Sequence, residues 1–484
     1  MRKGFLIVLA VVLVAALAAP AMAGMDAPSG FIRVKGYMSN FKSGATAPPL
    51  VLPADAPTNA YVEERFRAKF SFGEENVKAV WFVETDFNFG DSAGSAIPAN
   101  TTGGAGRNSG GALGGDRINL ETKNIYIWFK LPNTPLDFTV GLQNQTDRFA
   151  GVLYGAADMA GIFMTGKMEP ASFKIGWAKF YENSFSKTDD LTLYVAEVQF
   201  APTKELKIGA TFNFLQDDTQ KYASATNLPF PTLAGDTNKK QVYTLGVDGA
   251  FNAGPATISG FGFYQFGTVK PTLSNLDSDV DISGFAVDLR ADMNLGPGKF
   301  FIEGIYISGD SNDNTNKYKS IVTLNDTAAS PGGPSFYART DMMILLPNAD
   351  DINTNTALIG AAADPGSSLA SSSFACITSL GNCGRGITHV GTGFSMPLGK
   401  QLTGKVGAGY LMATKKLDNA DSTRKGKSMG TELNANVNYN IMKGLDFGLY
   451  GAYAWLGDFY QFNTPGAKDP DDLYDVHFRL NYAF

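Results

Sequence analysis

The last twelve residues of the chain alternate between apolar and polar side chains. The apolar positions are Tyr474, Val476, Phe478, Leu480, Tyr482 and Phe484, and the polar positions between them include Asp475, His477, Arg479 and Asn481. A period of two predicts a β-strand with one apolar face and one polar face. A chain built from such strands needs an apolar environment on one side of its sheet and water on the other.

The same alternation recurs along the whole chain and predicts about eighteen strands, with sixteen to twenty as the range. Short turns and long polar loops alternate between these strands, and the longest loop is the insertion 309–385. An even strand count with this alternation places both termini at the rim of the short turns. The predicted strands are 31–38, 61–72, 77–89, 118–131, 136–145, 160–168, 171–182, 190–200, 206–216, 241–252, 256–266, 282–293, 299–308, 386–398, 401–414, 428–441, 445–456 and 473–484.

The pattern favours a closed sheet in a membrane. Lipid cannot hydrogen-bond to the free edge of a sheet, so a sheet that spans a membrane must close on itself. In 428–441, Leu433 and Val437 would face lipid, and Glu432 and Asn434 would face water. A soluble β-sandwich is the alternative, but it would have short loops at both ends. We therefore predict an all-β, antiparallel transmembrane barrel with a water-filled lumen, since barrels of this size leave a channel.

Residues 1–23 have the features of a cleaved secretory signal. Arg2 and Lys3 precede an apolar run over 5–19, and an Ala-x-Ala cleavage site ends at Ala23. The run is shorter than the roughly twenty residues that a membrane-spanning helix needs. Residues 24–484 would then form a single barrel domain, and their net charge of −8 argues against a nucleic-acid partner.

The chain offers little for catalysis or for cofactor binding. Cys376 and Cys383 are the only cysteines, and in an oxidising compartment their spacing predicts a local disulfide. The G-x-S-x-G sequence at 90–94 has no helix pattern after its serine. Asp310, at the start of a calcium-loop spacing, lacks the glycine and the final acid of that motif. We predict no enzymatic activity, no cofactor and no metal site.

Six basic residues are predicted to gather on one wall of the lumen. All six have the parity of the polar face, and closure of the barrel makes the first and last strands neighbours. Six like charges on one wall repel each other unless water, anions or acids compensate them. This predicted basic wall comprises Arg33 and Lys35 on the first strand, Arg65, Arg67 and Lys69 on the second, and Arg479 on the last.

The signal sequence, the two-residue period and the terminal Tyr482-Ala483-Phe484 resemble those of the general porins of the Gram-negative outer membrane. The resemblance implies a location in outer-membrane lipid, a homotrimer, and recognition of Phe484 by the barrel-assembly machinery. In that family the third long loop folds inward and usually places acids opposite a basic ladder. The segment 146–159 is in that position, so Asp147 and Asp158, beside Arg148, are the candidate counter-charges. Glu84 and Asp86 on the third strand are the alternative partners.

These observations predict a porin for passive diffusion of small hydrophilic solutes and ions, with selectivity set by the basic wall. Two other classes stay open. One is a barrel that sheathes multihaem cytochromes for electron transfer. The other is an outer-membrane hydrolase, which is disfavoured because His477 belongs to the polar set rather than to the lipid-facing one. The insertion 309–385 is predicted to be a lid, an extra hairpin or a partner-binding cap.

Overall fold

The structure, a computed structural model, describes residues 24–40, 58–90, 111–114, 118–219, 238–271, 279–311, 316–324, 335–346, 380–416, 424–463 and 468–484. The predicted signal sequence 1–23 lies outside the described residues, and so does Cys376 of the predicted Cys376–Cys383 disulfide. No helix among the described residues is long and apolar enough to cross a membrane.

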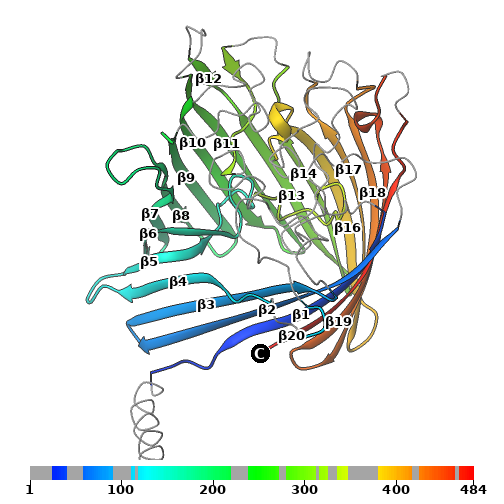
Figure 1. Ribbon diagram of the computed structural model, residues 1–484, viewed down its shortest axis with the longest axis horizontal. Coiled ribbons are helices and arrows are strands. Elements are labelled where there is room, and N and C mark those ends of the chain that lie inside the picture. The colour runs from blue at the N-terminus through cyan, green and yellow to red at the C-terminus, as the bar shows by residue number, and fades with distance from the viewer. Residues whose placement is uncertain are drawn as a thin grey trace, which may run out of the picture.

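Eighteen antiparallel strands form a closed wall within the described part of the chain (Figure 1). Each strand pairs with its neighbours in chain order, and β20 pairs back with β1 from Phe31–Ala483 to Ser39–Asp475. The wall strands are β1 (Ser29–Ser39), β2 (Asn59–Glu74), β3 (Val77–Asn88), β4 (Glu121–Lys130), β5 (Leu136–Gln145), β6 (Ala157–Met168), β7 (Ala171–Tyr181), β8 (Leu191–Phe200), β9 (Leu206–Asp217), β10 (Asn238–Asn252), β11 (Ala256–Pro271), β13 (Phe285–Leu295), β14 (Gly298–Ile307), β16 (Ile387–Pro397), β17 (Leu402–Ala413), β18 (Ser428–Met442), β19 (Leu445–Leu456) and β20 (Leu473–Ala483).

The predicted eighteen-stranded barrel is confirmed, with one local difference. The predicted strand 282–293 divides into β12 (Val280–Ile282) and β13. β12 pairs in parallel with β15 (Lys317–Tyr318), which belongs to the long insertion. Both segments pair with β11 in the same register, and the break includes Gly284, where an added Cβ would lie 2.2 Å from the carbonyl oxygen of Ser320. Two short 3-10 helices, Asn382–Gly384 and Asp458–Tyr460, lie in long connections.

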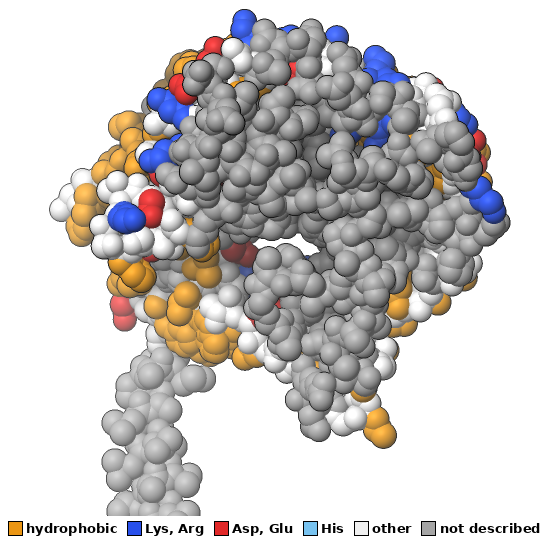
Figure 2. Space-filling view, turned by 45° about the horizontal axis from the view of Figure 1, so that its top comes forward, with side chains coloured by type: hydrophobic (Ala, Val, Ile, Leu, Met, Phe, Trp, Pro, Cys, Tyr) orange, Lys and Arg blue, Asp and Glu red, His pale blue; other side chains and the backbone are white. Residues whose placement is uncertain are grey.

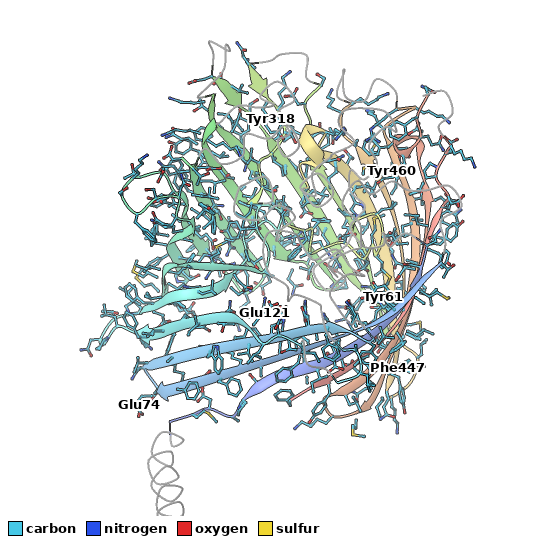
Figure 3. All side chains as sticks on the ribbon, in the orientation of Figure 1. Tyr61, Glu74, Glu121, Tyr318, Phe447 and Tyr460 are labelled. Atoms are coloured by element: carbon cyan, nitrogen blue, oxygen red, sulfur yellow. The ribbon has the colours of Figure 1, made fainter. Side chains whose placement is uncertain are left out.

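Short turns occupy one rim of the barrel and long connections the other. Glu74 and Phe447, which lie beside short turns, are at the lower rim in Figure 3, and Tyr318 and Tyr460, in long connections, are at the upper rim. This is the distribution of turns and loops in outer-membrane barrels. The predicted alternation of short and long connections is thus present in the structure.

The strands present an apolar face to the outside and a polar face to the inside. On β18, Leu433 is 48% exposed, whereas its neighbours Glu432 and Asn434 are buried. Figure 2 shows hydrophobic side chains on the flanks of the molecule. The exposed apolar face therefore surrounds the barrel, as a membrane requires.

Aromatic rings on the outer face lie close to both rims. Towards the long connections, Tyr194, Phe214, Tyr243 and Phe266 stack across four successive strands, with centroids 5.8, 4.5 and 5.3 Å apart. Towards the short turns, the Phe129 ring stacks on Phe138 of the next strand at 5.1 Å. Two such girdles mark the interfaces of a membrane with water in β-barrels.

Candidate functional site: the inner face of the barrel

The connection between β5 and β6 folds around Asp147. The Asp147 carboxylate accepts hydrogen bonds from the backbone N–H groups of Phe149, Gly151, Leu153 and Tyr154, at 2.7 to 2.9 Å. Asp147 is buried, and burial raises the pKa of its carboxyl group to about 6, against the lowering effect of these hydrogen bonds. The four amides hold the segment 147–154 in one compact turn.

This turn lies inside the barrel. The Phe149 ring packs against Phe261 and Phe263 of β11, with centroids 5.6 and 4.8 Å apart. Phe261 and Phe263 are buried and face inwards, whereas Tyr264, the next residue of β11, is 48% exposed on the outer face. Arg148 binds Asp248 of β10 through two hydrogen bonds of 2.7 and 2.6 Å.

Part of the long insertion also lies inside. Residues 342–346 are buried, and the backbone N–H groups of 343–345 donate to the Glu432 carboxylate of β18 at 2.6, 3.0 and 2.9 Å. Asn434 donates to the carbonyl oxygen of Asp341 at 3.0 Å, and Lys405 of β17 binds the Asp341 carboxylate at 2.5 Å. The insertion therefore reaches the inner face of β17 and β18.

A second group of contacts holds the insertion to β13. Asp288 accepts hydrogen bonds from the Tyr337 hydroxyl and from Arg339, both at 2.5 Å. Arg290 donates to the Arg339 carbonyl oxygen at 2.6 Å and binds Glu303 of β14 at 2.8 Å. Because Asp288 and Glu303 are buried while their strand neighbours face outwards, these contacts lie inside the wall.

The two inward segments dock against each other. The amides of Phe336 and Ala338 donate to the carbonyl oxygens of Gly151 and Ala150 at 3.1 and 2.9 Å. The Phe336 ring lies over Gly151 and Gly155, where an added Cβ would come within 2.9 and 2.5 Å of it. Residues 147–156 and 335–346 thus form one layer, which we call the inner layer, packed against the side of the wall from β10 to β18.

The predicted basic wall lies on the other side of the ring, on β1, β2 and β20. Arg33 is the cross-strand partner of Arg65, and Lys35 is the cross-strand partner of Arg479. Lys69 pairs with Ser29, nearer the short-turn rim. Arg33, Lys35, Arg65, Arg67 and Arg479 therefore lie within three neighbouring cross-strand rows of the wall. They share the inward face of their strands with buried residues such as Tyr37.

Acids of β3 pair with part of this basic group. Arg65 binds Asp86 through two hydrogen bonds of 2.7 and 2.6 Å, and its Nε lies 3.6 Å from Glu84. Arg67 also forms an ion pair with Glu84. The alternative counter-charges from the sequence, Glu84 and Asp86, are thus the ones that the structure places beside the basic residues.

The other predicted counter-charges have different partners. Asp147 binds the backbone of its own segment, and Arg148 binds Asp248, as described above. Asp158 binds Lys123 of β4 at 2.7 Å and accepts a hydrogen bond from Asn124 at 2.8 Å. None of the described contacts brings these residues to the basic wall.

A row of four aromatic rings in contact beside the basic wall was not predicted. Tyr61, Tyr37, His477 and Tyr450 are successive cross-strand partners on β2, β1, β20 and β19, with centroids 4.8, 5.1 and 4.6 Å apart. His477 also binds Asp475 at 2.5 Å. The register of four separate strands creates this row, and the sequence alone gives no register between distant strands.

Comparisons with known proteins find similar structures but no similar sequence. No protein-family model and no curated protein sequence matches the chain. Among solved structures, OccK8 (OprE) of Pseudomonas aeruginosa has 10% identity and a TM-score of 0.52, covering 94% of this chain and 98% of that one. OccAB2 of Acinetobacter baumannii has 10% identity and a TM-score of 0.51, with the same coverage.

A third similar structure, OpdQ of Pseudomonas aeruginosa, has 9% identity and a TM-score of 0.50, covering 94% of this chain and 97% of that one. At such identities the likeness concerns the fold. The chain therefore has the closed, eighteen-stranded antiparallel barrel fold of the outer-membrane porins of Pseudomonas and Acinetobacter.

Proposed function

We propose that this protein is an outer-membrane channel through which small hydrophilic solutes and ions diffuse passively, with a preference for anions. The exposed apolar exterior, the two aromatic girdles and the porin fold support a place in the outer membrane. The polar inner face supports passage of water-soluble molecules rather than chemistry. The passage would run between the inner layer and the wall formed by β19, β20 and β1 to β3.

The observation that carries the anion preference is the imbalance of charge on that wall. Asp86 and Glu84 neutralise Arg65 and Arg67. Arg33 and Arg479 have no ion pair with any acid among the described residues, and the Arg479 Nε is buried without a hydrogen-bond partner. Two guanidinium groups that form no ion pair raise the local concentration of anions in a narrow wet passage, and the Glu63 carboxylate near Arg33 offsets only part of this effect.

The test is the reversal potential of the purified protein in a planar bilayer across a KCl gradient. Wild-type protein should conduct and prefer chloride, and the double variant Arg33→Gln/Arg479→Gln should shift towards potassium. Lys443→Gln is the matched control, because Lys443 is exposed in the short turn between β18 and β19. Wild-type protein that carries no current would refute the channel, and an unchanged reversal potential in the double variant would refute the selectivity.

The cytochrome sheath is not proposed, because a protein partner in the lumen would compete for space with the inner layer. By resemblance to the general porins, we also propose a homotrimer and recognition of Phe484 by the assembly machinery. Sedimentation of the detergent-solubilised protein distinguishes a trimer from a monomer. For the insertion 309–385, its described contacts with β13, β17 and β18 favour a constriction element over a surface cap.

A further inference from the structure

Glu432 is an unusual residue for the inner face of a channel, because its carboxylate does not face water. It is the fifth of the fifteen residues of β18 and is fully buried, with Leu433 next to it facing outwards. Its hydrogen-bond donors are three backbone amides of the insertion and the Asn434 side chain, at 2.6 to 3.3 Å. No lysine, arginine or histidine among the described residues forms an ion pair with it.

The three amides depend on this carboxylate. Residues 343–345 belong to no helix or strand, so their N–H groups have no partner in a backbone ladder. Buried N–H groups need an acceptor, and hydrogen bonds to an ionised acceptor are the stronger class. One side chain of the wall therefore satisfies three successive amides of a segment that is apolar from Met342 to Leu346.

The remaining contacts of this segment come from the same two strands. The Met342 side chain lies against Gly409 of β17, where an added Cβ would be 2.7 Å from the Met342 sulfur. Asn434 and Lys405 hold Asp341 at its other end. Glu432 stands at the centre of this seat, which we define as Lys405, Gly409, Glu432 and Asn434.

We propose that Glu432 is the positioning residue that keeps the passage open, by holding residues 341–346 against the wall. The segment already lies at the periphery of the lumen, so any displacement from its seat moves it towards the axis. A released segment would then obstruct the passage intermittently. This proposal rests on the proposed channel function, of which it describes the regulation.

Single-channel recording tests the proposal, in a background where Cys376 and Cys383 are serine. Glu432→Ala should show transient closures at least ten times as frequent as in the parent, with the same current in the open state. Asn436→Ala is the matched control, since Asn436 lies on the same strand and the same face and binds no residue of the insertion among the described contacts. A Glu432→Ala recording as steady as the parent recording would overturn the proposal.

A disulfide staple separates this effect from general damage to the barrel. Met342→Cys and Gly409→Cys, added to Glu432→Ala, should restore steady current when oxidised and lose it again on reduction. Closures that persist in the oxidised, stapled protein would also overturn the proposal, because they would then arise elsewhere.

Hydrogen–deuterium exchange gives a readout that does not depend on conduction. The backbone amides of residues 343–345, which donate to Glu432, should exchange at least ten times faster in Glu432→Ala than in the parent, and oxidation of the staple should suppress the increase. If the parent carries no current, the channel function fails while this exchange still decides the role of Glu432. Equal exchange rates in the two proteins would refute the positioning role of Glu432.

Discussion

At the scale of single residues, Asp147 shows how a buried carboxyl group makes a loop sensitive to pH. Burial raises its pKa to about 6 in the folded protein, whereas an exposed aspartate titrates at about 3.9. The folded state therefore binds this proton more tightly than the unfolded state. The contribution to stability is fully present below about pH 4 and is lost as the pH rises through about 6.

We predict that the wild-type protein in detergent is more stable at pH 4.5 than at pH 7.5 through this group, by about 2 kcal/mol. Asp147→Asn has no such proton to lose, so the pH dependence of its thermal midpoint should be flatter. Asp279→Asn, at an exposed position in another long connection, should keep the wild-type dependence. Parallel profiles for wild-type protein and Asp147→Asn would contradict this interpretation.

At the scale of elements, the strands were predictable because their signal is local. The predicted strand 61–72 corresponds to β2 at Asn59–Glu74, and 445–456 matches β19 at Leu445–Leu456. Each strand carries its own alternation, whatever its partner. The seat of the inner layer was not predictable, because Glu432 meets amides that lie 87 to 89 residues away in sequence. In the sequence it is one more polar residue on a polar face.

The docking of the two inward segments depends on small residues under one ring. A side chain at Gly155 would overlap the Phe336 ring, whose nearest atom would lie 2.5 Å from the new Cβ. Gly155→Val should therefore weaken the inner layer by about 1–3 kcal/mol, as overpacking does in other protein interiors. Faster hydrogen–deuterium exchange of the Phe336 and Ala338 amides, which donate to Gly151 and Ala150, would report the separation of the two segments.

Two further variants control this experiment. Gly399→Val should leave the exchange of these amides unchanged, because nothing lies within 4 Å of a Cβ added at that turn. Adding Phe336→Ala to Gly155→Val removes the overlap with the ring, so it should slow the exchange relative to Gly155→Val alone. An unaltered exchange rate in Gly155→Val would show that the ring moves aside without cost to the layer.

At the scale of the whole molecule, closure followed from a physical requirement rather than from a motif. A sheet in lipid must satisfy its edge amides, and the pairing of β1 with β20 does so. The same argument placed Arg479 beside the first strand, although 444 residues separate it from Lys35, its cross-strand partner. The closure argument could not show which side of the lumen the long connections occupy, because the packing of loops produces no periodic pattern in the sequence.

The last residue tests whether closure and assembly have separate requirements. Phe484 exchanges two backbone hydrogen bonds of 3.0 Å with Gly30, and neither needs its side chain. The ring is 44% exposed on the outer face, with Phe66 and Tyr482 as neighbours at 6.4 and 6.1 Å. Phe484→Ala should therefore refold from urea into detergent with a loss of only about 1 kcal/mol. If the assembly machinery recognises this ring, the amount of Phe484→Ala protein in the outer membrane of expressing cells should fall several-fold.

Tyr482→Ala, on the same strand and face with 46% exposure, controls for lost apolar surface. It should reduce the stability in detergent and the amount in the outer membrane only slightly. Equal losses in detergent and in cells for Phe484→Ala would mean that the ring serves packing alone.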